Sequence, residues 1–294
     1  MEAGLEPADE ASRRVEARLG EWTAWVPEFR RPHRLIGLFT ARHYLGPAAQ
    51  DEEHLFWLSL VIGYWVWVDD RSDQRLDEQT ADWAHLVEVL ERRSAPPEAP
   101  APELDFLLRV ERGLSPLARD PADLEGFRLS AARVLDALRC EEEASRQRRL
   151  MAYAEYLEVG RHSIAVLNMA VTAALLLDLG LAERRADPRV TEGERFFCTV
   201  ARLENDLFSE QRDRSEGGTA NALLILETWL PRSARGFIES ELEAYRRLFD
   251  QALAALGPED AWGQLLRRAM AGHAAVYSTF GGGRYAPGGS PRST

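Results

Sequence analysis

The amino-acid sequence predicts an all-α protein, built as a single-domain helical bundle with roughly ten helices. Three observations lead to this prediction. Apolar residues recur at helical spacing along most of the chain. Strand signals are nearly absent, because no Asn-Gly turn joins two alternating apolar runs. The chain has 294 residues, 45% of them apolar, so it can bury one substantial core.

The predicted helices can be placed in order along the chain. Near the start, one apolar stripe comprises Val15, Leu19, Trp22 and Trp25. Further helices are predicted over residues 51–68, 80–93, from 103 onward, 122–148, 153–181 and 191–214, with two more between 233 and 280. Residues 94–102 are too rich in proline for a helix, so we expect an inter-helix loop there. We treat residues 1–294 as one domain, with flexible ends at about 1–12 and 286–294.

Charge and composition restrict the class of partner. The net charge of −12 argues against binding of nucleic acid or an anionic membrane through a general field. All 36 basic residues are arginine, so an anionic substrate would be bound by guanidinium groups, each able to make two bonds to a phosphate. Residues 163–181 form the longest apolar stretch, but they include Asn168 and Asp178. With an acidic start and no visible signal peptide, we expect a cytoplasmic protein without stable membrane insertion, in which Cys140 and Cys198 are reduced thiols.

A first group of carboxylates closes the most apolar stretch of the chain. Residues 55–68 carry no charge, and Asp69, Asp70 and Asp73 follow at once. Carboxylates at the end of an apolar helix are costly to bury unless a cation neutralises them. Asp69 and Asp73 are four residues apart, so they share one helix face. This pattern predicts a divalent metal ion at the mouth of an apolar cavity.

A second polar group lies late in the helix predicted over 191–214. Asn205, Ser209 and Asp213 fall at i, i+4 and i+8, so an amide oxygen, a hydroxyl and a carboxylate follow one helix face. Such hard oxygen ligands suit Mg²⁺, which completes its shell with water and substrate phosphate. A solvated polar face is the alternative. The apolar neighbours Leu207 and Phe208 indicate that the adjoining face is buried and favour the metal site.

With these motifs the chain resembles a class I terpene synthase of the compact bacterial type. The aspartate-rich DDxxD motif of that family is matched by Asp69, Asp70 and Asp73. Its second motif, N-D-x-x-S-x-x-x-(E/D), is matched by Asn205, Asp206, Ser209 and Asp213, with Arg212 as the basic residue before the last acid. The diphosphate-sensing arginine is matched by Arg161, 44 residues before Asn205, and the C-terminal Arg-Tyr pair by Arg284 and Tyr285. The resemblance covers essentially the whole chain and implies an all-α fold enclosing an apolar active-site cavity.

Three departures from the family pattern stand out. Asp213 occupies the last position of the second motif, where glutamate is common. Arg71 and Ser72 replace the more usual apolar pair inside the first motif. Ile164 and Ala165 stand where the family often has an acid and a glycine, so the trigger of ionisation is left open.

The resemblance implies a Mg²⁺-dependent terpene cyclase that ionises a linear isoprenoid diphosphate, with geranylgeranyl diphosphate slightly favoured over farnesyl diphosphate. Three Mg²⁺ ions are expected, and the implied metal ligands are Asp69, Asp70, Asp73, Asn205, Ser209 and Asp213. The implied diphosphate-binding residues are Arg161, Arg212, Arg284 and Tyr285. The implied catalytic residues are Asp69, Asp70, Arg161, Arg284 and Tyr285. The released diphosphate often takes the final proton in the family, so no general base is named, and His162 is interpreted as structural. Dimers are common in the family, so a homodimer is possible for this chain.

Aromatic faces can stabilise the allyl cation left after diphosphate departs, provided that the cavity excludes water. The sequence offers six candidates for the wall: Trp57, Tyr64, Trp65, Trp67, Phe208 and Tyr277. Of these we retain Tyr64, Trp65, Phe208 and Tyr277 as cavity-lining residues. Trp65 is favoured because it lies one helical turn before Asp69, on the same face.

Two other functions compete with this interpretation. A prenyl-elongating synthase also uses DDxxD on a helical bundle, but it would need a second aspartate-rich motif and is expected to use lysines, which this chain lacks. A non-catalytic helical interaction protein would carry the same carboxylates as acidic surface clusters. Substrate length, a pre-cyclised substrate and the product skeleton all remain open at this point.

Overall fold

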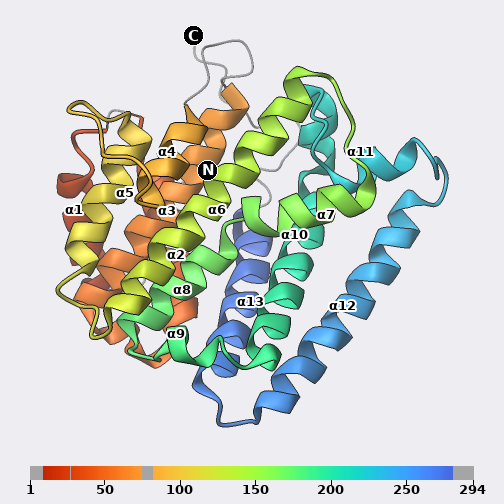
Figure 1. Cartoon of the computed structure of the whole chain (residues 1–294). Helices are drawn as coiled ribbons and strands as arrows, with labels where there is room; N and C mark the ends of the chain where they lie inside the picture. Colours follow the sequence, from red (N-terminus) through yellow and green to blue (C-terminus); the bar gives the residue numbers. More distant parts are fainter. Residues whose placement is uncertain (1–8, 27, 75–81, 281–294) are drawn as a thin grey trace.

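The structure, a computed structural model, describes residues 9–26, 28–74 and 82–280. These residues form α-helices and one short 3-10 helix, with no β-strand among them, which confirms the predicted all-α class. The elements are α1 (Glu10–Trp22), α2 (Arg31–Leu45), η1 (Gly46–Gln50), α3 (Glu52–Gln74), α4 (Trp83–Leu90), α5 (Pro102–Leu114), α6 (Pro121–Arg146), α7 (Tyr153–Ser163), α8 (Val166–Leu176), α9 (Leu181–Arg184), α10 (Pro188–Glu216), α11 (Ala222–Glu227), α12 (Ala234–Leu256) and α13 (Ala261–Phe280) (Figure 1).

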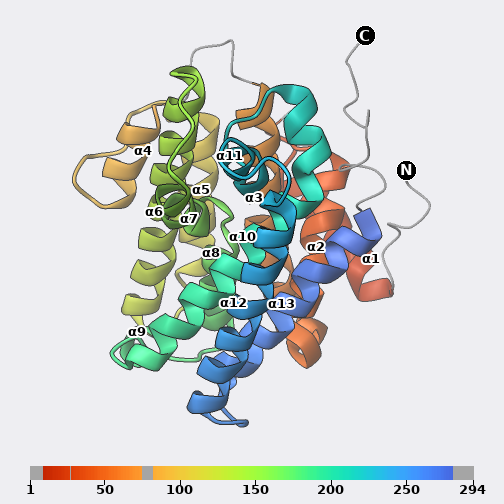
Figure 2. The ribbon, with the colours of Figure 1, turned by 90° about the vertical axis from the view of Figure 1, so that its right-hand side faces the viewer.

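The long helices surround a central space rather than a single seam. Helix α2 packs along α3 and is met from the other side by α13, while α8 contacts α3, α10 and α13. Helix α12 covers the outer side of α10 (Figures 1 and 2). The helices α2, α3, α8, α10 and α13 therefore form the wall of a compartment, with α6 and α7 closing it.

Helix α3 is central because it is apolar on nearly every side. From Leu55 to Val68 all side chains but Val66 are buried, as expected for a helix enclosed by neighbours rather than amphipathic at a surface. One of its faces carries Trp57, Tyr64 and Trp67, which pack with the ring of Phe106 from α5 or with Trp22. That face belongs to the core, which leaves the opposite face for the compartment.

Two glycines allow α2 to lie unusually close to α3. A Cβ atom on Gly37 would lie 2.3 Å from the carbonyl oxygen of Ser59, and one on Gly63 would lie 2.9 Å from that of His33. Real Cβ atoms do not approach so closely, so both positions require glycine for the observed contact. The pair sets the distance between two walls of the compartment.

The prediction of one continuous helix over residues 153–181 is wrong, because the chain forms two helices there. Ile164 ends α7, and Ala165 adopts a left-handed conformation with φ of 60° before α8 begins. The stretch Tyr153–Leu176 is long and apolar enough to cross a membrane, but 67% of its most apolar window is buried inside the bundle. It is therefore the broken core segment of the fold.

Other boundaries differ in smaller ways. Helix α1 begins at Glu10, so residues 10–12, which we expected in a flexible end, are helical and capped by Asp9, whose carboxylate accepts a hydrogen bond from the Ser12 amide. The proline-rich segment is a connection as predicted: it joins α4 to α5, and Pro102 occupies the first turn of α5, where its missing N–H costs nothing. The sequence analysis gave no place to α2 or to the short helices η1, α9 and α11.

We predict that Gly37→Ala lowers the free energy of unfolding by about 1–3 kcal/mol, because the new methyl group overpacks the α2–α3 contact. Urea unfolding followed by the helical circular dichroism signal measures the change. Gly236→Ala in α12 is the matched control: no atom lies within 4 Å of its Cβ position, so this change should stabilise the protein by about 0.5–1 kcal/mol. Equal stability of Gly37→Ala and wild type would show that α2 can move away from α3 without cost.

Candidate active site

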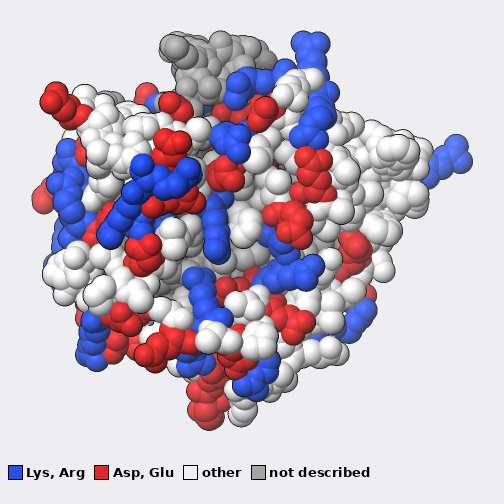
Figure 3. Space-filling view, viewed as in Figure 1, with Lys and Arg blue, Asp and Glu red and all other residues white. Residues whose placement is uncertain are grey.

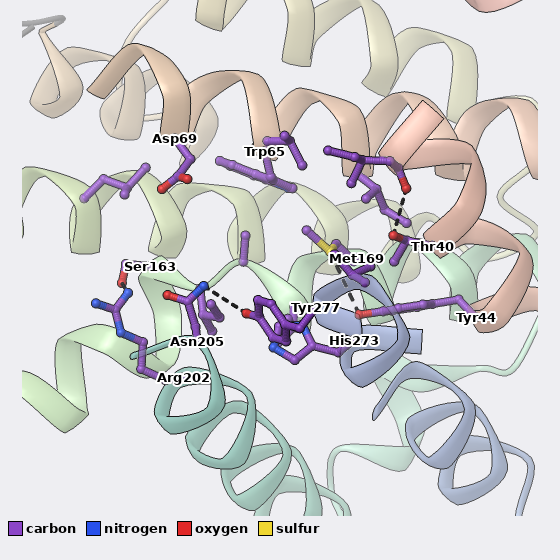
Figure 4. A pocket seen from close by; sticks show the side chains of 18 residues that line it. Thr40, Tyr44, Trp65, Asp69, Ser163, Met169, Arg202, Asn205, His273 and Tyr277 are labelled. Carbon is purple, nitrogen blue, oxygen red and sulfur yellow. Dashed lines mark hydrogen bonds between the residues drawn. The ribbon is translucent and has the colours of Figure 1, made fainter. Parts of the chain in front are cut away.

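The compartment contains a cavity of about 120 Å³ that opens to solvent at one end. The residues that line it come from α2, α3, α6, the α7–α8 connection, α8, α10 and α13: Ile36, Thr40, Tyr44, Ile62, Trp65, Val66, Asp69, Leu138, Ser163, Ile164, Ala165, Val166, Met169, Arg202, Asn205, His273, Val276 and Tyr277. Polar groups gather at the end marked by Asp69, Arg202 and Asn205, and the end near Tyr44 and Met169 is apolar (Figure 4). The cavity thus combines a charged mouth with an apolar interior.

The first motif contributes one carboxylate to this mouth. Asp69, at the end of α3, lines the cavity. Asp70 lies off that face and accepts a hydrogen bond from His33, whose Nε2 is 2.9 Å from its Oδ2. The Arg30 amide donates to Nδ1 of His33, so Nε2 carries the ring proton and is the donor to Asp70. Asp73 falls within α3, but its side chain lies outside the described part of the structure.

The second motif lies on α10, facing the first across the cavity. The Asn205 amide nitrogen donates to the Tyr277 hydroxyl at 2.9 Å, which turns the amide oxygen toward the polar end (Figure 4). One turn later, Ser209 is buried and its hydroxyl donates to Oδ2 of Asp213 at 2.5 Å. Asn221 also donates to this Oδ2, at 2.8 Å, and so holds the last acid of the motif in place.

Asn221 belongs to the connection between α10 and α11. Its amide oxygen caps α11 by accepting from the Leu223 amide, and its nitrogen also donates to the backbone carbonyl of Asp206 at 2.9 Å. One fully buried side chain therefore fixes the motif helix, the acid at its end and the start of the next helix.

A buried ionic network supports α10 at the level of the motif. Asp206 is fully buried; both of its carboxylate oxygens accept from the Tyr156 hydroxyl at 2.7 Å, and Nε of Arg202 lies 3.1 Å from Oδ1. Burial raises the pKa of Asp206 to about 6, although Arg202 and Tyr156 oppose the rise. Arg202 reaches this position over Gly160, where a Cβ atom would lie 3.0 Å from its Cγ.

The other side of the Arg202 guanidinium faces the α7–α8 break. Its Nη1 lies 3.3 Å from the Ser163 hydroxyl and 3.7 Å from the carboxylate of Glu141, to which Ser163 donates at 2.6 Å. Burial raises the pKa of Glu141, and the carboxylates of Asp69 and Asp213 add to the rise. Arg202 is thus the guanidinium that lines the cavity, placed among carboxylates from both sides of the mouth.

The predicted diphosphate-binding residues are placed differently from one another. Arg161 pairs with Glu158 one turn earlier on α7 and is not among the cavity-lining residues. Arg212 lies beside the second motif, 3.4 Å from Oδ1 of Asp213. Arg284 and Tyr285 lie outside the described residues. His162, interpreted as structural, is half-buried, and burial lowers its pKa.

Trp65 and Tyr277 are the predicted aromatic residues that line the cavity. The indole of Trp65 donates to Oδ1 of Asn168 at 2.7 Å, and Asn168 in turn donates to the Phe127 carbonyl and the Ser130 hydroxyl. The ring of Phe208 is half-exposed and stacks on Tyr277, with centroids 4.4 Å apart. Phe208 therefore supports the wall from outside rather than lining it.

Tyr64 faces away from the cavity. Its hydroxyl donates to the Glu103 carbonyl of α5, and its ring packs against Phe106 and Trp67. Tyr64 and Trp65 are neighbours on α3, and neighbouring helical residues point about 100° apart, so Trp65 can line the cavity while Tyr64 packs into the core. Trp57 and Trp67 are likewise absent from the cavity lining and belong to the core face of α3.

The sequence reasoning missed Arg202, Asn168, Asn221, Glu141 and His273. Two signals could have found some of them. Arg202 precedes Asn205 by three residues on the same helix face. The chain has only three asparagines, Asn168, Asn205 and Asn221, and each of them contributes to this site. Glu141 gave no signal, because it stands in a run of three glutamates.

Comparison with known protein families gives this site an identity. Residues 61–235 match the model described as terpene synthase family 2, C-terminal metal binding. The matched segment is more than half of the chain and contains both motifs. This chain belongs to the terpene synthase family. It is a class I terpene synthase, a carbon–oxygen lyase, and its family binds metal.

Solved structures share the fold of this terpene synthase. The linalool/nerolidol synthase from Streptomyces clavuligerus, in complex with 2-fluorogeranyl diphosphate, superposes with a TM-score of 0.72 at 19% identity, covering 92% of this chain and 98% of that one. The 2-methylisoborneol synthase from Streptomyces coelicolor A3(2) gives a TM-score of 0.70 at 16% identity, covering 95% and 93% of the two chains. These likenesses confirm the class I terpene synthase fold.

The described donors fit a hard metal ion with mixed ligands. Among the described residues, no three His, Cys, Asp or Glu side chains converge as a metal-binding group. Asp69, Asn205, Ser209 and Asp213 instead supply carboxylate, amide and hydroxyl oxygens. The hydroxyl oxygen of Ser209 and Oδ2 of Asp213 already lie 2.5 Å apart. This oxygen set suits an ion that takes the rest of its shell from water and substrate.

We predict that Trp65 and Asn168 are energetically coupled. Asn168→Ala should lower the free energy of unfolding by about 1–3 kcal/mol, because it leaves the buried indole N–H without its acceptor. Trp65→Phe removes that N–H, so the double variant should be less destabilised than the sum of the two singles by at least about 1 kcal/mol. Urea unfolding of the four proteins completes the cycle. Additive changes would show that the bond does not orient the indole.

Proposed function

We propose that this terpene synthase is a Mg²⁺-dependent cyclase, which ionises a linear isoprenoid diphosphate and cyclises the resulting cation. One observation carries the proposal: a single cavity has Asp69 from the first motif and Asn205 from the second at its mouth, and apolar and aromatic residues inside. Bound Mg²⁺ would supply charge neutralisation for the departing diphosphate. The ligands proposed for about three ions are Asp69, Asp70, Asp73, Asn205, Ser209 and Asp213.

The residues of the mouth would bind the diphosphate and stabilise its negative charge. Arg202 presents a guanidinium at the cavity wall, and we add it to the proposed diphosphate-binding residues Arg161, Arg212, Arg284 and Tyr285. As the C–O bond breaks, its electron pair stays with the diphosphate, so a fixed guanidinium there stabilises the leaving group. Arg202 also contacts Ser163 beside the α7–α8 break, where the family often has an acid and a glycine. Through this contact, Arg202 would connect the bound diphosphate to the backbone break at Ile164 and Ala165.

The interior would hold the cation away from water. The faces of Trp65 and Tyr277 can stabilise positive charge without forming a bond to it. Both rings are fixed, Trp65 by Asn168 and Tyr277 by Asn205 and by stacking with Phe208. Fixed rings hold the substrate chain in one folded conformation, which favours ring closure over reaction of the cation with water.

The cavity size supports a short substrate chain. An apolar cavity of about 150 Å³ holds one benzene molecule, and this cavity measures about 120 Å³. The cavity opens to solvent, so a bound chain can extend beyond this volume, but each added isoprene unit leaves more of the chain outside the enclosed apolar part. We therefore propose geranyl diphosphate as the preferred substrate, in place of the geranylgeranyl diphosphate that the sequence slightly favoured.

The two rival functions have less support. A prenyl-elongating synthase must accommodate a growing chain, for which this cavity is small. A non-catalytic interaction protein would carry its acids on the surface. Acidic and basic side chains are indeed interspersed over the face seen in Figure 3, but Asp206 and Ser209 are buried inside the bundle.

We predict that the protein converts geranyl diphosphate with Mg²⁺ to a hexane-extractable terpene and that EDTA abolishes this turnover. Asn205→Ala and Asp69→Ala should each lower kcat/KM at least about 100-fold, because both remove a ligand that acts on the leaving group. Gas chromatography of the extract and a diphosphate-release assay measure the two products. Asp250→Ala, an exposed change on α12, is the control and should leave turnover intact. Elongated diphosphates would instead indicate a prenyl synthase, and no turnover at any chain length a binding protein.

We predict that Met169→Ala shifts the preference toward farnesyl diphosphate. Met169 lies at the apolar end of the cavity, where its sulfur is 3.9 Å from the Tyr44 hydroxyl. Removing its side chain should raise the farnesyl-to-geranyl ratio of kcat/KM about 10-fold. Met151→Ala is the matched control, because Met151 is buried in the second core cluster, away from the cavity. An unchanged ratio in Met169→Ala would show that this end does not limit chain length.

A further inference from the structure

His273 forms part of the cavity wall, in a place that neither motif explains. It lies on α13 one turn before Tyr277, and the two rings meet edge to face with centroids 4.8 Å apart. Its Nε2 is 3.1 Å from the backbone carbonyl oxygen of Ala201 on α10. In Figure 4 the imidazole lies between the polar end, marked by Asn205, and the apolar end, marked by Tyr44. His273 therefore borders the space where a substrate chain would lie.

The protonation of this imidazole is fixed by its surroundings. A carbonyl oxygen only accepts hydrogen bonds, so Nε2 must carry the ring proton. Burial lowers the pKa of His273, although Glu204 and the bond to Ala201 oppose this, so the ring is neutral near pH 7. In a neutral ring protonated at Nε2, Nδ1 holds an unshared electron pair. No other hydrogen bond of this ring is found in the described part of the chain.

The other polar groups of the apolar end do not offer comparable basicity. The Thr40 hydroxyl donates to the Ile36 carbonyl at 2.8 Å, and the Tyr44 hydroxyl donates to the sulfur of Met169. The oxygens of both hydroxyls are far weaker bases than imidazole. The carboxylate of Asp69 lies at the mouth, where the diphosphate and its metal ions are proposed to bind. His273 is thus the neutral base of the cavity interior.

We propose that Nδ1 of His273 accepts the proton that ends the reaction, an assignment that rests on the proposed cyclase function. A C–H bond next to the final cationic carbon breaks, and its electron pair becomes the π bond of the product alkene. The proton forms an N–H bond at Nδ1, which converts the ring to imidazolium. Glu204, on α10, supplies the opposing charge. The imidazolium returns its proton to diphosphate or water after the product leaves.

This assignment separates two steps of the reaction. Loss of diphosphate takes place at the mouth and does not involve His273. Loss of the proton takes place in the interior and decides which alkene is formed. A variant without the base should therefore still ionise the substrate but end the reaction differently, through water capture or loss of another proton to diphosphate. The expected effect is on products rather than on consumption of substrate.

The experiment compares His273→Phe and His273→Gln with wild type on geranyl and farnesyl diphosphates. Both variants should still release diphosphate, while the share of the main alkene among the products should fall at least about 10-fold, as expected for loss of a positioned base. Gas chromatography with mass spectrometry measures the product ratio. The two variants differ in shape and polarity, so a result common to both reflects loss of the base, and either one suffices if the other does not fold.

The matched control is His43→Gln. His43 lies on α2 against Gly272, but it is not a cavity-lining residue, so its replacement should leave the product ratio unchanged. An unchanged ratio in the His273 variants, or a wild-type enzyme that forms only alcohols, would overturn the assignment. Wild type that consumes no isoprenoid diphosphate would overturn the proposed cyclase function and the assignment with it. Normal wild-type turnover with unaltered variant products refutes the role of His273 alone.

Discussion

The site depends on one buried ion pair, between Arg202 and Asp206. Two charges removed from water are costly unless they are paired and hydrogen-bonded. Here the pair is completed by the Tyr156 hydroxyl and by the backbone of residues 220 and 222. Because these partners come from α7, from the connection after α10 and from the start of α11, the pair locks three segments to α10. The positions of Asn205, Ser209 and Asp213 follow from that lock, since all three lie on the helix that it holds, and Asn205 is the one of the three that lines the cavity.

On the opposite side of the cavity, hydrogen-bonded pairs also position the wall that α3 forms. Helix α3 is apolar enough to be enclosed, so a polar group on it is costly to bury without a hydrogen-bond partner. Asn168 provides this for the Trp65 indole, and His33 provides it for Asp70. The close glycine contact then brings α2 near enough for Thr40 and Tyr44 to reach the same space. Packing and polar pairing together fix the positions of the helices that form the cavity wall.

Much of this could be read from the sequence, and the limits have physical causes. Helical periodicity located the long helices, and motif spacing located Asp69 and Asn205, which the structure brings to one cavity. The break before α8 was missed because Ile164 and Ala165 are ordinary helix residues, and only tertiary contacts hold Ala165 in a left-handed conformation. Trp65 was favoured from its spacing to Asp69, but Tyr64 was wrongly kept beside it, since both faces of an enclosed helix are apolar. Glu141 became visible only when α6 and α10 were placed together, because it then meets Arg202.

The interrupted backbone between α7 and α8 has an implication for the evolution of new products. Ile164 and Ala165 line the cavity at the junction of two helices, where the Ile164 amide makes the last bond of α7 to the Gly160 carbonyl and the Ala165 carbonyl accepts the first bond of α8. Substitutions in the middle of α3 or α10 disturb a buried helix along with the cavity. At half-buried Ile164 the side-chain volume can vary beside the cavity with less of that penalty, whereas Ala165 is buried and its φ of 60° disfavours larger side chains. Natural diversification and laboratory engineering of the terpene skeleton would therefore find their most permissive position at Ile164.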